Sequence, residues 1–306
     1  MPRNSELKVR VMTAAIYVGA MMILIIPGLW VPLIPVFLFT AVAFLSAYEK
    51  GQAVRLRLPE TKVLAVAVIS VLLGLSALLG IVRGSLLGGL PASLEASMRT
   101  LVAARIFGYF ALLALFILPM LSLVPMWRKG SESLTAAVAM SALVLSSAVP
   151  LASVIALLYG CYLGWHWLVL ALLTSWVSDT CAYFAGKYLG RMPFSPALSP
   201  KKTWEGTVGG IVGTILLYLV YFPLVIGKAS GYASGTSLAF APVAAVFMSL
   251  TATLGDLQSS ALKRWSGIKD FGALLPGHGG ISDRFDSIFT ALPAALLLAI
   301  FAGAVL

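Results

Sequence analysis

The chain has 306 residues, with 21 Lys and Arg against 11 Asp and Glu, so its formal net charge is +10. Hydrophobic residues make up 60% of it and charged residues only 10%, whereas a soluble domain has about 45–50% apolar and about 25% charged residues. This composition excludes an ordinary water-soluble globule and also a disordered chain, which needs low hydrophobicity. The few basic residues are too scattered for a nucleic-acid surface, so we expect no nucleic-acid partner.

Long apolar segments recur along the whole chain, and a helix needs roughly 20 such residues to cross a bilayer. We therefore expect an all-α, polytopic integral membrane protein with about nine transmembrane helices. We interpret the first as an uncleaved span rather than a signal peptide, since similar spans follow. Pro150 interrupts the fifth, which can kink or split there. The expected spans are 11–27, 30–48, 62–82, 100–125, 136–162, 166–187, 207–227, 236–255 and 286–306.

The basic residues sort strongly between the two sides that nine spans define. One side, which includes the N-terminus, receives all but four of the 21 Lys and Arg. By the positive-inside rule that side is cytoplasmic, so we expect a cytoplasmic N-terminus. The exceptions are Arg83, Arg99, Arg105 and Lys228.

Polar chemistry is concentrated after residue 175. We therefore expect residues 1–165 to form lipid-facing scaffold helices and residues 166–306 to form a catalytic region with its site on the cytoplasmic side. The two cysteines, Cys161 and Cys181, lie in apolar surroundings without metal-binding spacing, which favours inert packing.

The first polar cluster is Asp179 with Tyr183, four residues later on the same helical face. An isolated carboxylate within an apolar span is costly, so it should face the protein interior or an aqueous cavity. A functional role is favoured over a structural hydrogen bond.

The second cluster contains Ser199, Lys201 and Lys202 and reads as a basic turn that enters a helix. Lysines there oppose the helix dipole unless they help bind an anion. Anion binding and simple anchoring at the membrane surface are equally compatible with the pattern. The following glycines, Gly206, Gly209, Gly210 and Gly213, have the spacing of close helix packing.

The third cluster, from Asp256 to Asp286, is the densest. If residues 254–265 are helical, one face carries Asp256, Ser260, Lys263 and Arg264. Asp283 and Asp286 begin the last span, where acids also suit a helix N-terminus, with Ser282 as a possible cap. Between them lie glycines that allow close ligand approach, together with Lys269, Asp270, His278 and Arg284.

Carboxylates among basic side chains indicate a type of chemistry. Carboxylate oxygens bind Mg²⁺ while substrate phosphates complete its shell, and Lys and Arg neutralise phosphate charge. At a membrane surface this combination suggests metal-assisted phosphoryl or nucleotidyl transfer. The chain has no P-loop and no serine nucleophile elbow.

The third cluster reads Ser260-x-Leu262-Lys263-Arg264-x4-Lys269-Asp270-x-Gly272-x2-Leu275-Pro276-x-His278-Gly279-Gly280-Ile281-x-Asp283-Arg284-Phe285-Asp286. This pattern resembles the signature of the phosphatidate cytidylyltransferases, or CDP-diacylglycerol synthases. The runs Asp179-Thr-x-Ala-Tyr183 and Ser199-Pro-Lys-Lys-Thr-Trp-Glu-Gly206 resemble upstream motifs of that family. The resemblance is strong over about the last 130 residues. One departure is Ser259, where the family commonly has an acid, which puts in doubt either a supporting carboxylate or the strength of metal binding.

The resemblance implies the reaction of CTP with phosphatidate to give CDP-diacylglycerol and pyrophosphate, in a bacterial cytoplasmic (inner) membrane. It also implies a homodimer and Mg²⁺ held by Asp256 and Asp283, with a monovalent cation such as K⁺. We expect Lys263 and Arg264 to take part in catalysis, and Asp286, Asp179 and His278 to orient ligands. The substrate-binding candidates are Lys201, Lys202, Ser199, Ser260, Lys269, Arg284 and Tyr183.

Two other functions are alternatives. A CTP-dependent lipid kinase would use similar groups but attack the γ-phosphorus. A transporter would use the aspartates as a cation pathway, and it predicts inverted repeats, of which the sequence gives no sign. A CDP-alcohol phosphotransferase needs an Asp-rich motif that the chain lacks.

Overall fold

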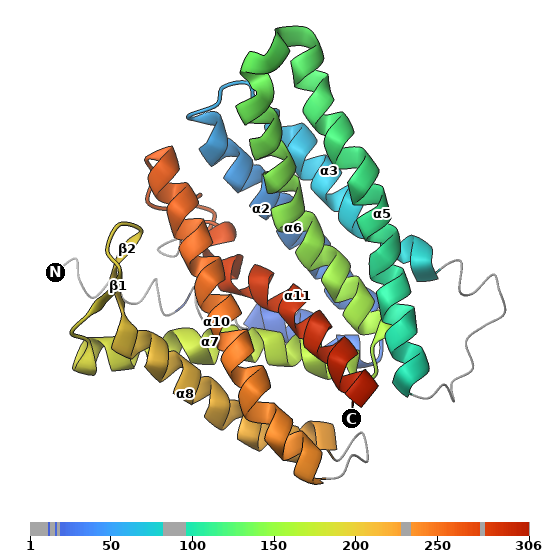
Figure 1. The fold of residues 1–306 in the computed structure, drawn as a ribbon, viewed down its shortest axis with the longest axis vertical. Helices are drawn as coiled ribbons and strands as arrows, with labels where there is room; N and C mark the ends of the chain where they lie inside the picture. The colour runs from blue at the N-terminus through green and yellow to red at the C-terminus, as the bar shows by residue number, and fades with distance from the viewer. Residues whose placement is uncertain are drawn as a thin grey trace. The chain divides into compact units, whose positions relative to one another are not determined.

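The computed structural model describes residues 12, 16, 19–81, 96–227, 234–275 and 279–305. Over these ranges the chain is almost entirely helical (Figure 1). The helices are η1 (Ile26–Leu29), α2 (Leu33–Arg55), α3 (Val63–Leu75), α5 (Ala96–Lys129), η2 (Gly130–Ser133), α6 (Leu134–Gly160), α7 (Gly164–Leu189), α8 (Trp204–Tyr221), η3 (Phe222–Gly227), α10 (Ser234–Ser266) and α11 (Ser282–Val305).

Eight helices among the described residues are long and apolar enough to cross a membrane. They coincide with the second to ninth expected spans, so the expectation of an all-α polytopic membrane protein is confirmed. Most of the first expected span lies outside the described residues, and its described end is a shorter apolar helix over Gly19–Leu29. Pro150 does not split the fifth span, because α6 continues through it. Neighbouring groups can satisfy the backbone that a proline frees within a span.

A small hairpin interrupts the helices before α8. Strands β1 (Pro193–Ser195) and β2 (Ser199–Thr203) pair antiparallel, with Pro193 opposite Thr203. The expected basic turn at Ser199 is therefore a strand, which the sequence analysis did not predict. The Thr203 hydroxyl then caps α8 by accepting a hydrogen bond from the backbone N–H of Gly206 at 3.1 Å. Glu205 in the first turn accepts one from Met192 N at 3.2 Å, which ties the hairpin to the helix.

The described fold consists of two compact units, each made of several chain segments. The first unit comprises Met1–Gly89, Arg105–Ile155 and Leu262–Phe285. Within it α2 packs against α3. Helix α3 also lies close to α6, as a Cβ added at Gly74 of α3 would be only 2.8 Å from Leu151 of α6. Figure 1 draws these elements in blue to green.

The second unit comprises Leu90–Ala104, Ala156–Ala261 and Asp286–Leu306. Its centre is the pair α7 and α8, which lie side by side in Figure 1. Glycines of α8 make this contact possible, since a Cβ at Gly210 would lie 2.9 Å from the Ser178 carbonyl, and one at Gly209 would overlap Ala185. The predicted small-residue packing is thereby confirmed.

The compact units do not follow chain order. The last residues of α10 and the first turn of α11 belong to the first unit, and the rest of both helices belongs to the second. The expected division at residue 165 concerns function, and it stays a prediction.

Candidate active site

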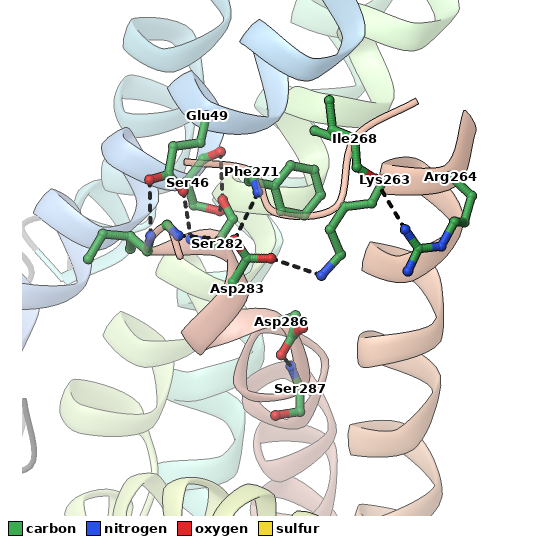
Figure 2. Close-up of polar contacts among 12 residues, drawn as sticks. Ser46, Glu49, Lys263, Arg264, Ile268, Phe271, Ser282, Asp283, Asp286 and Ser287 are labelled. Carbon is green, nitrogen blue, oxygen red and sulfur yellow. Dashed lines mark hydrogen bonds and ion pairs between the residues drawn. The ribbon is translucent and has the colours of Figure 1, made fainter. Parts of the chain in front are cut away.

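In the first unit the Asp283 carboxylate is the centre of a buried polar cluster. Asp283 lies in the first turn of α11, and its side chain is only 3% exposed. The Lys263 ammonium, 11% exposed, donates to Oδ1 at 2.8 Å. Oδ2 accepts hydrogen bonds from the backbone N–H groups of Phe271 at 2.8 Å and Gly280 at 3.0 Å (Figure 2). Three donors therefore hold this carboxylate in one orientation.

Two glycines with positive φ shape the chain between α10 and α11. Gly267, at φ +75°, follows the end of α10, and the next N–H bonds back to the Lys263 carbonyl at 2.9 Å. This is the usual glycine termination of a helix. The carbonyl of Gly279, at φ +83°, accepts a hydrogen bond from Leu275 N at 2.9 Å. Phe271 and Gly280, both between α10 and α11, donate to the Asp283 carboxylate.

Glu49 of α2 is a site residue that the sequence analysis missed. Its Oε1 accepts a hydrogen bond from Ile281 N at 3.0 Å, and its Oε2 accepts one from Ser282 N at 2.8 Å. The Ser282 hydroxyl donates to the Ser46 carbonyl at 3.2 Å, so the possible capping role of Ser282 is not what the structure shows. One signal in the sequence that could have found Glu49 is a carboxylate at the end of an apolar span.

In the second unit Asp256 of α10 forms an ion pair with Lys202 of β2. The Asp256 Oδ2 and Lys202 Nζ atoms are 2.6 Å apart, and the side chains are 28% and 23% exposed. The helical arrangement expected for residues 254–265 is confirmed. The hairpin thus brings a basic side chain to this carboxylate from far along the chain.

A second carboxylate contact in this unit joins α7 to α11. The Ser287 hydroxyl donates to Asp179 Oδ2 at 3.4 Å, and Ser287 N donates to Asp286 Oδ1 at 2.8 Å. Tyr183 is 62% exposed, and its ring packs edge to face with Phe184. Asp179 and Asp286 therefore both accept a hydrogen bond from Ser287, whereas the Tyr183 ring contacts Phe184.

The other expected site residues differ in how exposed they are. Ser260 is buried and Ser199 is half-buried. Arg264 is exposed and donates to the Ile268 carbonyl at 3.2 Å. His278 lies outside the described residues. Ser259, which replaces the family's acid, is buried. Lys201, Lys269 and Arg284 are also exposed.

The carboxylates supply oxygen donors suited to a hard cation. Within the described ranges, no group of three or more His, Cys, Asp and Glu side chains could hold a metal ion. Mg²⁺ commonly binds through only one or two carboxylates, with waters and substrate phosphates as its other ligands. Asp256 fits that pattern, since its side chain is 28% exposed and could bind a cation together with water. The Asp283 carboxylate already accepts three hydrogen bonds, so a cation there would have to replace the Lys263 ammonium.

Both ion pairs combine a carboxylate with a lysine that can bind phosphate. Lys is a compact point charge on a flexible stem, so its ammonium can pass from a carboxylate to an incoming phosphate oxygen. Each unit therefore places a basic side chain for a phosphate beside a carboxylate for a cation.

A known protein family and individual known proteins match this chain. The pattern of the Cytidylyltransferase family matches residues 8–301. Proteins named phosphatidate cytidylyltransferase are 39% identical over 137 residues in Staphylococcus saprophyticus (45% of this chain, 50% of that protein) and 37% identical over 132 residues in Haemophilus influenzae (43% and 45%). One from Staphylococcus aureus strain COL is 40% identical over 142 residues (45% and 50%).

The chain thus spans about half the length of the curated relatives it matches. The family match extends across both compact units and all eight described spans. It includes the two ion pairs and the glycine turns around Asp283. This chain belongs to the Cytidylyltransferase family.

Proposed function

We propose that the chain transfers the cytidylyl group of CTP to phosphatidate, giving CDP-diacylglycerol and pyrophosphate. The printed names of its relatives support this activity, as does the membrane-spanning fold in which the carboxylates and lysines occur. The observation that carries the proposal is the buried Asp283 carboxylate, held by Lys263 and two backbone N–H groups. A carboxylate fixed this strongly, beside the ammonium of Lys263, suits the handling of a phosphate and its counter-ion.

The reaction needs little proton transfer. The phosphatidate phosphate is already anionic, so it attacks the α-phosphorus of CTP without a general base, and pyrophosphate leaves. Positioning and charge stabilisation then provide most of the rate, as in phosphoryl transfer generally. Lys263 and Lys202 provide the positive charge within reach of Asp283 and Asp256. Exposed Lys201, Lys269 and Arg284 add charge where the nucleotide arrives.

We propose Mg²⁺ as the cofactor, with the carboxylates of Asp256 and Asp283 each as a candidate ligand. Bound magnesium would withdraw negative charge from the phosphate oxygens. Asp286 and Asp179, linked by Ser287, would orient groups around it. A monovalent cation such as K⁺ is proposed beside it.

We propose that the protein lies in a bacterial cytoplasmic membrane as a homodimer, with its N-terminus and its site on the cytoplasmic side. The distribution of Lys and Arg among the loops supports this orientation. The bacterial origin of the relatives supports the membrane assignment. CTP then reaches the site from the cytosol, while phosphatidate keeps its acyl chains in the bilayer.

The decisive experiment is product analysis with the purified full chain in phosphatidate-containing vesicles. Labelled CTP and Mg²⁺ should yield CDP-diacylglycerol and pyrophosphate in equal amounts. Phosphorylated lipid with CDP would instead identify a lipid kinase. Asp283→Asn should lower the rate well beyond threefold, and a rate within threefold of wild type would refute the role of this carboxylate in metal binding.

A further inference from the structure

We infer that Glu49, on a helix outside the motifs, is a positioning residue that holds the turn carrying Asp283. This inference rests on the proposed function for its catalytic consequence. Glu49 accepts hydrogen bonds from two successive backbone N–H groups, those of Ile281 and Ser282, at 3.0 and 2.8 Å. Figure 2 shows the carboxylate of Glu49 facing this segment from α2.

The two N–H groups lie where α11 begins, and the first N–H groups of a helix have no partner within the helix. A carboxylate satisfies them with charge-assisted hydrogen bonds and interacts favourably with the helix dipole. In most helices a residue next to the first turn provides this cap. Here the cap comes from a residue more than 200 positions earlier in the chain.

The same short segment is held from its other side by Asp283. The Asp283 Oδ2 accepts the N–H groups of Gly280 and Phe271, while Glu49 accepts the next two after Gly280. Two carboxylates on different helices therefore fix three successive N–H groups, from Gly280 to Ser282. Any shift of the segment at Glu49 must move the backbone that orients Asp283.

The contact with Glu49 explains why positions 272 and 280 of the signature are glycine. A Cβ at Gly280 would lie 2.6 Å from both carboxylate oxygens of Glu49, and one at Gly272 would lie 2.8 Å from Oε1. Both distances are too short for a real side chain. The absence of a side chain at these positions thus lets Glu49 reach the backbone.

Other contacts of α2 keep Glu49 in register with the segment. The Ser46 hydroxyl lies 3.0 Å from that of Ser282, one helical turn before Glu49. Phe39 packs edge to face against the buried ring of Phe285, with ring centroids 6.3 Å apart. α2 therefore contacts the start of α11 at three levels, through Phe39, Ser46 and Glu49.

The test uses the full chain with Glu49→Ala, Glu49→Gln and the control Glu60→Gln, which changes an exposed carboxylate after α2. Displacing a catalytic group by about 1 Å can cost on the order of 100-fold in rate. We expect Glu49→Ala to lower kcat by about 10–100-fold while the KM for phosphatidate changes little. Glu49→Gln should recover part of the rate, because its amide oxygen still accepts one N–H group. Glu60→Gln should match wild type.

Amide hydrogen exchange gives a readout that does not depend on the reaction. The N–H groups of Ile281 and Ser282 should exchange at least about tenfold faster in Glu49→Ala, because their acceptor is lost. Unchanged exchange would overturn the inference even in an active enzyme. Faster exchange with kcat within twofold of wild type would overturn the link to catalysis. A wild-type chain that makes no CDP-lipid would refute the proposed function, while the exchange data would still decide whether Glu49 holds the turn.

Gly280→Ala provides an independent variant should Glu49→Ala fold poorly. Its Cβ would push the Glu49 carboxylate away, so it should reproduce the loss of kcat. The double variant Glu49→Ala/Gly280→Ala should lose no more kcat than either single variant, because the three atoms nearest to the added Cβ all belong to Glu49. Losses that multiply would show that the two residues act separately and would overturn the inference.

Discussion

Replacing Lys263 by methionine should destabilise the protein several times more than the same change at Lys202, although the Lys202 ion pair is the shorter one. The Nζ to carboxylate distances are 2.8 Å for Lys263–Asp283 and 2.6 Å for Lys202–Asp256. Distance alone would therefore predict that the Lys202 ion pair is the stronger of the two. Burial reverses the order, because the Asp283 side chain is 3% exposed and that of Asp256 is 28% exposed.

The magnitudes follow from what each variant leaves behind. Removing one partner of a buried ion pair costs about 3–5 kcal/mol, because the other charge stays buried without compensation. Two backbone N–H groups still bind Asp283 Oδ2 in Lys263→Met, so we expect the lower end, about 3 kcal/mol. In Lys202→Met water can solvate Asp256, and a solvent-accessible pair contributes at most about 1 kcal/mol.

The measurement is denaturant unfolding of the purified chain in detergent micelles, followed by tryptophan fluorescence. Methionine keeps most of the apolar stem of lysine, so the loss reports mainly on the charge. Lys201→Met, at an exposed position on the same strand as Lys202, is the matched control and should lie near wild type. An equal or larger loss at Lys202 than at Lys263 would refute the reasoning that burial decides the strength of these pairs.

Three further predictions concern packing, capping and thiol reactivity. Gly209→Ala should cost about 1–3 kcal/mol in unfolding free energy, because its Cβ would overlap α7; Gly108→Ala, with nothing within 4 Å, should cost none. Thr203→Ala should lower the unfolding free energy by about 1 kcal/mol, because it removes the cap of α8, whereas Thr203→Ser should keep the cap. Thermal unfolding of both variants measures this difference. Burial raises the pKa of the Cys161 thiol to about 12, so only about 10⁻⁴ of it is thiolate at pH 8. Maleimide should therefore label Cys161 only after unfolding, and rapid labelling of the native protein would contradict this.

The spans were predictable because hydrophobicity is a property of the local sequence. A run of about 20 apolar residues has to form a helix in a bilayer, whatever its neighbours are. All eight described spans lie where their apolar runs indicated. Helix packing at Gly209 and Gly213 was predictable for a similar reason, since small residues four apart form one flat helix face.

The hairpin before α8 was not predictable from periodicity. Residues 199–203 contain a proline and two lysines, and this composition equally suits a turn. Pairing with Pro193–Ser195 made it a strand, and pairing depends on residues several positions away. The consequence matters for the site, because β2 carries Lys202 to Asp256.

The sequence by itself determined the membrane fold, the family and the candidate residues, since composition and motif spacing are readable along a single chain. Only the tertiary structure decided which charges meet. It paired Lys263 with Asp283 and Lys202 with Asp256, and it brought Glu49 to a turn more than 200 residues away. Glu49 belongs to no motif with its partners, because it binds their backbone N–H groups, which every residue except proline has. Contacts to the backbone leave little trace in sequence, and here that trace was the two glycines beside which Glu49 lies.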